Sequence, residues 1–160
     1  NDEERITLIN KVLECPSTIS NLYTVLMPNQ LTRPHFAISE FIKSAIKGKA
    51  INIKNPLTLR SFIGIDEVLL SIILFVSSEN GFHQYSLGSP LPISMIDLGN
   101  IVIDFYGKGS ISLNKDSWMN TPTSYYPSID NIHPIMRKLL RPDSKRKING
   151  LLEQVRIDKK

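Results

Sequence analysis

The arginine at position 60 is the residue whose place in the sequence most suggests chemistry. It stands in the stretch LRSFIGIDEVLLSIILFV, residues 59–76, just before an apolar run that is otherwise typical of a protein core. A guanidinium in such a place can present a planar, two-pronged set of N–H donors to a phosphate. It can equally pair with the carboxylate of Asp66 or Glu67. The residue types alone leave both roles open.

A second group of polar residues precedes a predicted helix and could extend an anion-binding surface. Arg33 and His35 flank Pro34, which suits the first turn of a helix, and Asn29 lies shortly before them. A helix N-terminus has unpaired N–H groups and a partial positive charge, so an arginine beside it favours an anion. The alternative for Arg33 is a side chain that is simply solvated.

Other signatures of catalysis are missing from the sequence. Its eight glycines form no GxGxxG loop and no Walker A loop, so we expect no phosphate loop in this chain. The histidines show no metal-ligand spacing with cysteines or carboxylates. The one cysteine, Cys15, cannot form an internal disulfide and has no evident base to activate it. On its own, this is not the sequence of a complete enzyme.

Composition sets the broad class. The chain has 160 residues, 41% apolar and 21% charged, which suits one globular domain spanning 1–160. Net charge is +4, and its basic run from Arg137 to Lys147 has no interleaved aromatics, which disfavours nucleic-acid binding. The longest apolar stretch, 68–76, is too short to span a bilayer. Without a disulfide framework or signal peptide, we expect a cytoplasmic protein that binds no membrane.

Short strands and helices alternate along the chain and must position these residues. Pattern and turn signals predict helices at 1–14, 32–48, 67–76, 92–107, 128–140 and 144–155. They predict strands at 22–27, 49–55, 61–65, 82–88 and 110–114, with a turn at 15–21 and a loop at 118–127. The fold class is therefore α/β or α+β, with about six helices and five short strands.

Capping residues mark several of these helices. Ser94 is a predicted N-cap with Asp97 three residues on, as in a capping box, and Gly107 is a predicted C-terminal stop. Asp66 is predicted to cap the helix at 67–76. The helix at 1–14 carries one apolar stripe, formed by Ile6, Ile9 and Leu13.

Read in order, four stretches resemble the C-terminal half of the extended short-chain dehydrogenase/reductases, which are NAD-dependent nucleotide-sugar epimerases and dehydratases. The stretches are SEFIKSAIKGKAINI, LRSFIGIDEV, FHQYSLGSPLPISMIDLGNIVIDFYG and YYPSIDNIHPIMRKLLRPDSKRKINGLLEQV. The family pattern is a helix ending in glycine, a strand, Arg-(Asp)-Phe before a helix, then a strand and a Ser-capped helix. The resemblance covers about 27–155 and is nearest to bacterial UDP-N-acetylglucosamine or UDP-glucose 4-epimerases.

The resemblance implies an α/β substrate-binding lobe without the Rossmann half, and it implies a role for individual residues. Arg60 matches the arginine that contacts the nucleotide diphosphate. The other residues implied in substrate binding are Asn29, Arg33, His35, Phe36, Ile53 and Tyr125. Pro28 is implied next to the cofactor, NAD or NADP, which the Rossmann half would mainly bind. Residues 1–26 would be a remnant of the helix and strand that join the two halves, and a homodimer is a further option.

The sequence also departs from the family pattern. TLINK places Thr7 and Lys11 at the spacing of the catalytic Tyr-x-x-x-Lys of the family. Threonine stands where the family has tyrosine, so no catalytic residue is assigned. Lys54 stands where an aromatic often stacks on the base, and Ser86 where asparagine is common. The expected function is nucleotide-sugar binding within an NAD(P)-dependent epimerase, dehydratase or reductase. The alternative is a non-catalytic binding or assembly module derived from that family.

Overall fold

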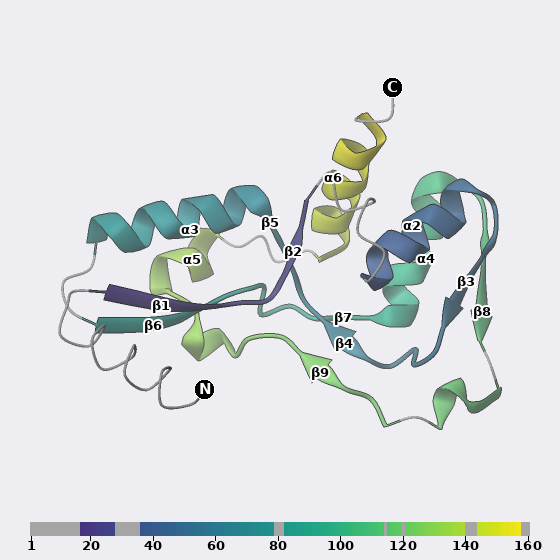
Figure 1. The fold of residues 1–160 in the computed structure, drawn as a ribbon, viewed down its shortest axis with the longest axis horizontal. Helices are drawn as coiled ribbons and strands as arrows, with labels where there is room; N and C mark the ends of the chain where they lie inside the picture. The colour runs from purple at the N-terminus through teal and green to yellow at the C-terminus, as the bar shows by residue number, and fades with distance from the viewer. Residues whose placement is uncertain are drawn as a thin grey trace, which may run out of the picture.

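The computed structural model describes residues 17–27, 36–78, 82–113, 115–119, 121–139 and 144–157. The helix expected over 1–14 and four of the residues implied in binding (Pro28, Asn29, Arg33 and His35) lie outside these described residues. The described elements, in order, are β1 Ser17–Leu22, β2 Thr24–Leu26, α2 Ala37–Ile46, β3 Ala50–Ile53, β4 Leu59–Arg60, β5 Phe62–Gly64, α3 Ile65–Ser78, β6 Phe82–Leu87, β7 Ile93–Ser94, α4 Met95–Tyr106, β8 Ser110–Leu113, η2 Lys115–Trp118, β9 Ser124–Tyr125, η3 Ile129–Asn131, α5 Pro134–Leu139 and α6 Ser144–Ile157 (Figure 1).

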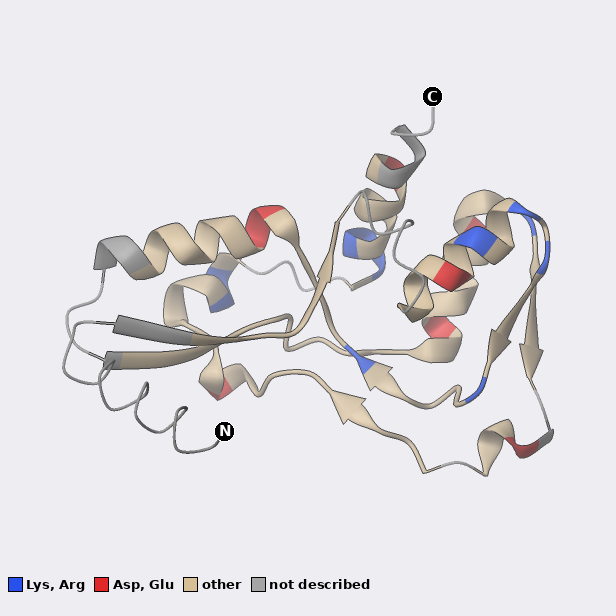
Figure 2. Ribbon diagram, in the orientation of Figure 1, with Lys and Arg blue, Asp and Glu red and all other residues tan. Residues whose placement is uncertain are grey.

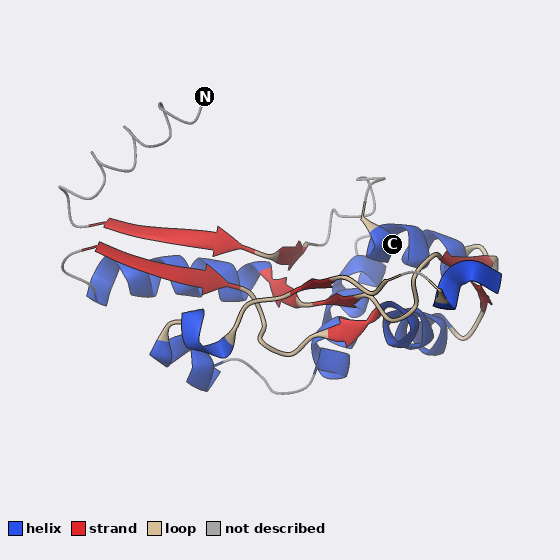
Figure 3. Ribbon diagram, turned by 90° about the horizontal axis from the view of Figure 1, so that it is seen from below, coloured by secondary structure: helices blue, strands red, loops and turns tan. Residues whose placement is uncertain are grey.

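The strands form small sheets that are mostly parallel. β1 pairs with β6, β2 with β5, and β3 with β8, all in parallel register. The fourth sheet has three strands, in which β4 lies between the antiparallel β7 and the parallel β9. Helices lie against these strands, as the view from below shows (Figure 3). The sheet order places β4, and so Arg60, in the middle of a sheet.

Two main hydrophobic clusters hold the elements together. The larger one joins α2, α4 and α6 to β3 and includes Ala45, Leu98 and Val102, none of which is exposed. The second lies between α3 and its neighbouring strands and is built from Ile63, Val68, Phe75 and Leu87. Figure 1 shows the corresponding arrangement, with α2 and α4 beside β3 and β8, and α3 and α5 beside β1 and β6.

Capping explains where several helices begin and end. The Ser94 hydroxyl accepts the Asp97 N–H at 3.1 Å, and Gly107 ends α4 in the left-handed conformation at φ +65°, which confirms both predictions. The prediction that Asp66 caps α3 is wrong. The helix already begins at Ile65, and the Glu67 carboxylate accepts the Gly64 N–H at 2.9 Å. This is one half of a capping box, in which the side chain of the third helical residue accepts the N–H of the residue before the helix.

Other boundaries also differ from the sequence prediction. The expected turn over 15–21 is a strand from Ser17 onward, because β1 pairs residue for residue with β6 and tertiary pairing overrides local turn signals. The helix expected over 128–140 is split into η3 and α5. α5 begins at Pro134, whose missing N–H is tolerated only in a first turn. The loop expected over 118–127 contains β9.

No helix in the described part of the chain is long and apolar enough to cross a membrane.

Gly99 provides a direct test of how tightly α4 packs on the β3–β8 pair. A Cβ added at Gly99 would lie 2.7 Å from Ile111 Cδ1 and 3.1 Å from Ile53 Cδ1. We expect Gly99→Ala to lower the free energy of unfolding by about 1–2 kcal/mol net, because moving the ends of two packed isoleucine side chains costs more than the roughly 0.5–1 kcal/mol that alanine's helix preference returns. Urea unfolding followed by circular dichroism measures the change.

The matched control for this prediction is Gly150→Ala in α6. A Cβ there would meet nothing within 4 Å, so the helix-forming preference of alanine acts alone. We expect Gly150→Ala to raise the free energy of unfolding by about 0.5–1 kcal/mol. Equal effects of the two variants would contradict the close packing of α4.

Candidate functional site

Arg60 is held in place by neutral oxygen atoms. Its Nη1 donates to the carbonyl oxygen of Leu59 at 2.8 Å and to that of Thr123 at 3.2 Å. Its Nη2 donates to the Thr123 hydroxyl at 3.1 Å. Thr123 itself is held to β4, because its carbonyl also accepts the Leu59 N–H at 2.9 Å. The guanidinium is therefore fixed in orientation by the segment that leads into β9.

The positive charge of Arg60 has no carboxylate partner among the described residues. The pairing with Asp66 or Glu67 that the sequence left open does not form, since the hydrogen bonds that Arg60 makes to described residues go to uncharged acceptors. Glu67 is occupied by Gly64 and Lys147. A half-buried arginine that is oriented but not neutralised is suited to binding an anion.

Tyr125 lies next to Arg60. The two residues are partners in the parallel register of β4 and β9. The Tyr125 ring packs on Tyr23, with ring centroids 4.7 Å apart and planes inclined by 39°, and half of the residue remains exposed. The structure thus places Arg60, an oriented cation, beside the aromatic ring of Tyr125. These are two of the seven residues that the family resemblance implies in substrate binding.

Two further implied residues lie in other parts of the fold. Phe36 occupies the N-cap position of α2 and is 40% exposed. Ile53 is buried in the larger core cluster, where its backbone carbonyl accepts the Ser117 hydroxyl at 3.1 Å. Both belong to the α2–α4 part of the molecule rather than to the β7–β4–β9 sheet. Neither is a hydrogen-bonding partner of Arg60.

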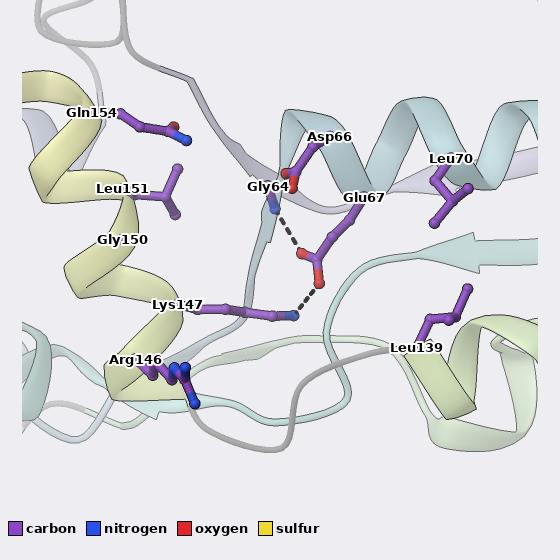
Figure 4. Close-up of a pocket in the computed structure, with 10 residues that line it drawn as sticks. All are labelled: Gly64, Asp66, Glu67, Leu70, Leu139, Arg146, Lys147, Gly150, Leu151 and Gln154. Atoms are coloured by element: carbon purple, nitrogen blue, oxygen red, sulfur yellow. Dashed lines mark hydrogen bonds and ion pairs between the residues drawn. The ribbon is translucent and has the colours of Figure 1, made fainter.

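The sequence did not single out a cleft that the structure forms between two helices. It has a volume of about 330 Å³ and lies between α6 and the start of α3, with Leu139 of α5 at its side (Figure 4). The lining residues are Gly64, Asp66, Glu67, Leu70, Leu139, Arg146, Lys147, Gly150, Leu151 and Gln154.

An ion pair crosses this cleft. Lys147 Nζ lies 2.8 Å from Glu67 Oε1, while Glu67 Oε2 accepts the Gly64 N–H (Figure 4). The two side chains are only 9% and 19% exposed, so the pair is largely withdrawn from water. Lys147 Nζ makes no hydrogen bond in the described part of the chain beyond this ion pair. The position of Glu67, three residues after Gly64, is a signal that could have indicated this cap in place of Asp66, but nothing in the sequence indicated its pairing with Lys147.

The described residues offer no metal site, since they contain no group of three histidine, cysteine or carboxylate side chains that could hold an ion. His133 is buried and packs edge-on against Tyr85, with centroids 4.9 Å apart, and its Nδ1 accepts the Ile135 N–H at 3.2 Å.

Breaking the ion pair tests its role. We expect Lys147→Met to lower the free energy of unfolding by about 3–5 kcal/mol, because it leaves Glu67 charged and largely buried without a counter-charge. The double variant Glu67→Gln/Lys147→Met should recover most of that loss, since glutamine still accepts the Gly64 N–H and no charge remains buried. Urea unfolding measures both. A double variant as unstable as Lys147→Met would refute this account.

Comparison with known proteins shows similarity in structure only. No family model matches the sequence, and no curated protein matches it. Among solved structures, UDP-glucuronic acid 4-epimerase from Bacillus cereus matches 96% of this chain with a TM-score of 0.74 and 17% identity, over 49% of its own length. UDP-N-acetylglucosamine 4-epimerase from Bacillus cereus matches 96% of this chain with a TM-score of 0.73 and 12% identity, over 50% of its length.

A dehydratase is similar as well. dTDP-glucose 4,6-dehydratase from Bacillus anthracis matches 94% of this chain with a TM-score of 0.65 and 14% identity, over 49% of its length. The chain therefore has the fold of about half of these enzymes and spans about half of their length. This confirms, at the level of fold, the α/β class and the resemblance to the extended short-chain dehydrogenase/reductases.

Proposed function

We propose, from the premise that this chain shares the fold of half of a nucleotide-sugar epimerase or dehydratase, that it is the nucleotide-sugar binding part of such an NAD(P)-dependent enzyme. The observation that carries the proposal is the arrangement around Arg60. Its guanidinium is oriented by Thr123, lacks a carboxylate partner among the described residues, and stands beside an exposed tyrosine.

The proposed role of Arg60 is to hold the diphosphate of the substrate. The guanidinium has five N–H donors, of which two bind Thr123 and one binds Leu59. The two donors on Nη1 bind the two backbone carbonyls. The guanidinium therefore keeps donors that can reach a phosphate oxygen. Because the strand and Thr123 fix the arginine beforehand, little side-chain entropy is lost on binding. Holding the diphosphate in this way would position the sugar for a reaction at a cofactor that is bound mainly outside this chain.

Tyr125 is proposed to contribute a stacking surface. One part of its ring is covered by Tyr23, and the exposed remainder offers a flat face to a nucleotide base. Four other residues join the proposal through the family resemblance: Asn29, Arg33, His35 and Phe36, which would line the nucleotide pocket. Ile53 would act from the core beneath that pocket.

The described residues do not themselves fit the pyrophosphate of a dinucleotide. The turn from β5 to α3 is a strand-to-helix turn of the kind that binds phosphate, but the Glu67 carboxylate already accepts its Gly64 N–H. Asp66 adds a second negative charge there. We therefore propose that NAD or NADP, which would take up and return a hydride, is bound mainly outside this chain, with Pro28 as a contact. No residue of this chain is proposed as catalytic.

Binding of UDP to the chain tests the role of Arg60. Loss of a charge-assisted hydrogen bond costs about 1.5–3 kcal/mol, so we expect Arg60→Ala to raise the Kd for UDP by about 10- to 100-fold. Uridine, which lacks phosphate, should bind both proteins equally. Isothermal titration calorimetry measures these constants. Lys108→Ala, which removes one exposed positive charge from the loop after α4, is the charge-matched control. An unchanged Kd for UDP in Arg60→Ala would overturn the proposal.

The stacking role of Tyr125 predicts a different pattern. Tyr125→Ala should raise the Kd values for uridine and for UDP by the same factor. A base stacked on an aromatic ring contributes about 1–3 kcal/mol to the binding free energy, whether or not phosphate is present. Tyr125→Phe, which keeps the ring, should bind both ligands as the unchanged chain does. If Tyr125→Ala affected UDP alone, the ring would serve the phosphate side of the site instead.

A further inference from the structure

Thr123 gives two oxygen atoms to Arg60, and these bind different nitrogens of the guanidinium. The Thr123 carbonyl accepts from Nη1 at 3.2 Å, and the Thr123 hydroxyl accepts from Nη2 at 3.1 Å. The other N–H of Nη1 donates to the Leu59 carbonyl at 2.8 Å. Both donors of Nη1 are therefore occupied, whereas Nε–H and the second N–H of Nη2 bind no described residue.

The two remaining donors of Arg60 lie along one edge of the planar guanidinium. Parallel N–H groups on such an edge can bind two oxygen atoms of one phosphate. A phosphate that is linked on both sides, as the inner phosphate of a nucleoside diphosphate is, has only two oxygens free to accept. This contact would use both of them, so any further donor beside Arg60 would meet a different phosphate.

The Thr123 hydroxyl is such a donor. Its oxygen accepts from Arg60, while its own proton goes to no acceptor in the part of the chain that the structure describes. Thr123 is exposed, and the bond from the guanidinium polarises its hydroxyl toward donating. The two N–H groups of Nη2 diverge by about 120°, so an oxygen bound to the second one would lie roughly 5 Å from the Thr123 hydroxyl. That separation is too large for one oxygen to bind both.

Tyr125, Arg60 and Thr123 follow one another along one face of the sheet. Arg60 is the register partner of Tyr125, and Thr123 lies two residues before Tyr125 on the same extended segment. Because the guanidinium binds Thr123, it leans away from Tyr125. The segment 117–129 has no charged residue, and Figure 2 shows β4 with its one cation beside an uncharged β9. No carboxylate on this segment would repel a phosphate.

We propose that Thr123 donates a hydrogen bond to the outer phosphate of a nucleoside diphosphate whose inner phosphate is bound by Arg60. The base would stack on Tyr125, so the order of the three side chains matches the order of base, inner phosphate and outer phosphate in the ligand. Thr123 is then the residue that distinguishes a diphosphate from a monophosphate. This inference rests on the proposed function, in which Arg60 binds the diphosphate.

UDP and UMP differ by the outer phosphate and therefore test the role of Thr123. Thr123→Val removes the hydroxyl but keeps the backbone carbonyl that holds Nη1 of Arg60. We expect this variant to raise the Kd for UDP by about tenfold or more and to leave the Kd for UMP unchanged. Thr123→Ser keeps a hydroxyl and should bind both nucleotides as the unchanged chain does. Isothermal titration calorimetry measures these constants.

A purely positioning role of Thr123 predicts a different result. If Thr123 only oriented Arg60, Thr123→Val would raise the Kd for UDP and for UMP by the same factor, and the inference would be wrong. Unchanged Kd values for both nucleotides would also overturn it. In either case the proposed function would stand if Arg60→Ala still weakened UDP binding. A chain that binds no UDP at all would instead overturn both.

Thr121→Val is the matched control. Thr121 is also exposed and loses the same hydroxyl, but its hydrogen bond to Asn55 is made by its backbone carbonyl. We expect Thr121→Val to leave the Kd values for UDP and UMP unchanged. A rise in the Kd for UDP equal to that of Thr123→Val would show that contact with Arg60 is not what matters, and would contradict the inference.

Discussion

The carboxylate of Glu67 is the point on which the arrangement of the elements depends. One of its oxygens accepts the Gly64 N–H at the end of β5, and the other pairs with Lys147 of α6. The Glu67 side chain therefore contacts the junction where β5 ends and α3 begins, and it joins this junction to α6. α6 itself packs in the larger hydrophobic cluster. Since the pair is largely buried, neither partner can be removed without leaving a charge in a poorly solvated place.

The position of Arg60 follows from this junction. β4 and β5 are separated only by Ser61, so whatever fixes the end of β5 also fixes the strand that carries the arginine. Close packing of α4 at Gly99 secures the other side, because β7 runs directly into that helix and pairs with β4. The strand that carries the guanidinium is therefore held between elements that lead into α3 and α4.

The sequence predicted those features that local chemistry determines. The cap at Ser94, the stop at Gly107 and the α/β class all follow from nearby residues, and the family resemblance agrees with the fold. Features that depend on distant partners were missed. The pairing of Lys147 with Glu67 joins residues 80 positions apart, and β1 exists because of its pairing with β6. At the site, the pattern around Arg60 could not show that Thr123, rather than a carboxylate, would bind it.

The three-stranded sheet around β4 has a consequence for how the protein acquires its site. Arg60 and Thr123 are 63 residues apart, and β4 has only two residues with which to hold its neighbours. Contacts of such long sequence separation form after local helices, because closing the long loop costs entropy before any contact repays it. We therefore expect the oriented guanidinium to be among the last features to form during folding. A chain arrested with its helices formed but this sheet open would present arginine to solvent as an ordinary mobile cation.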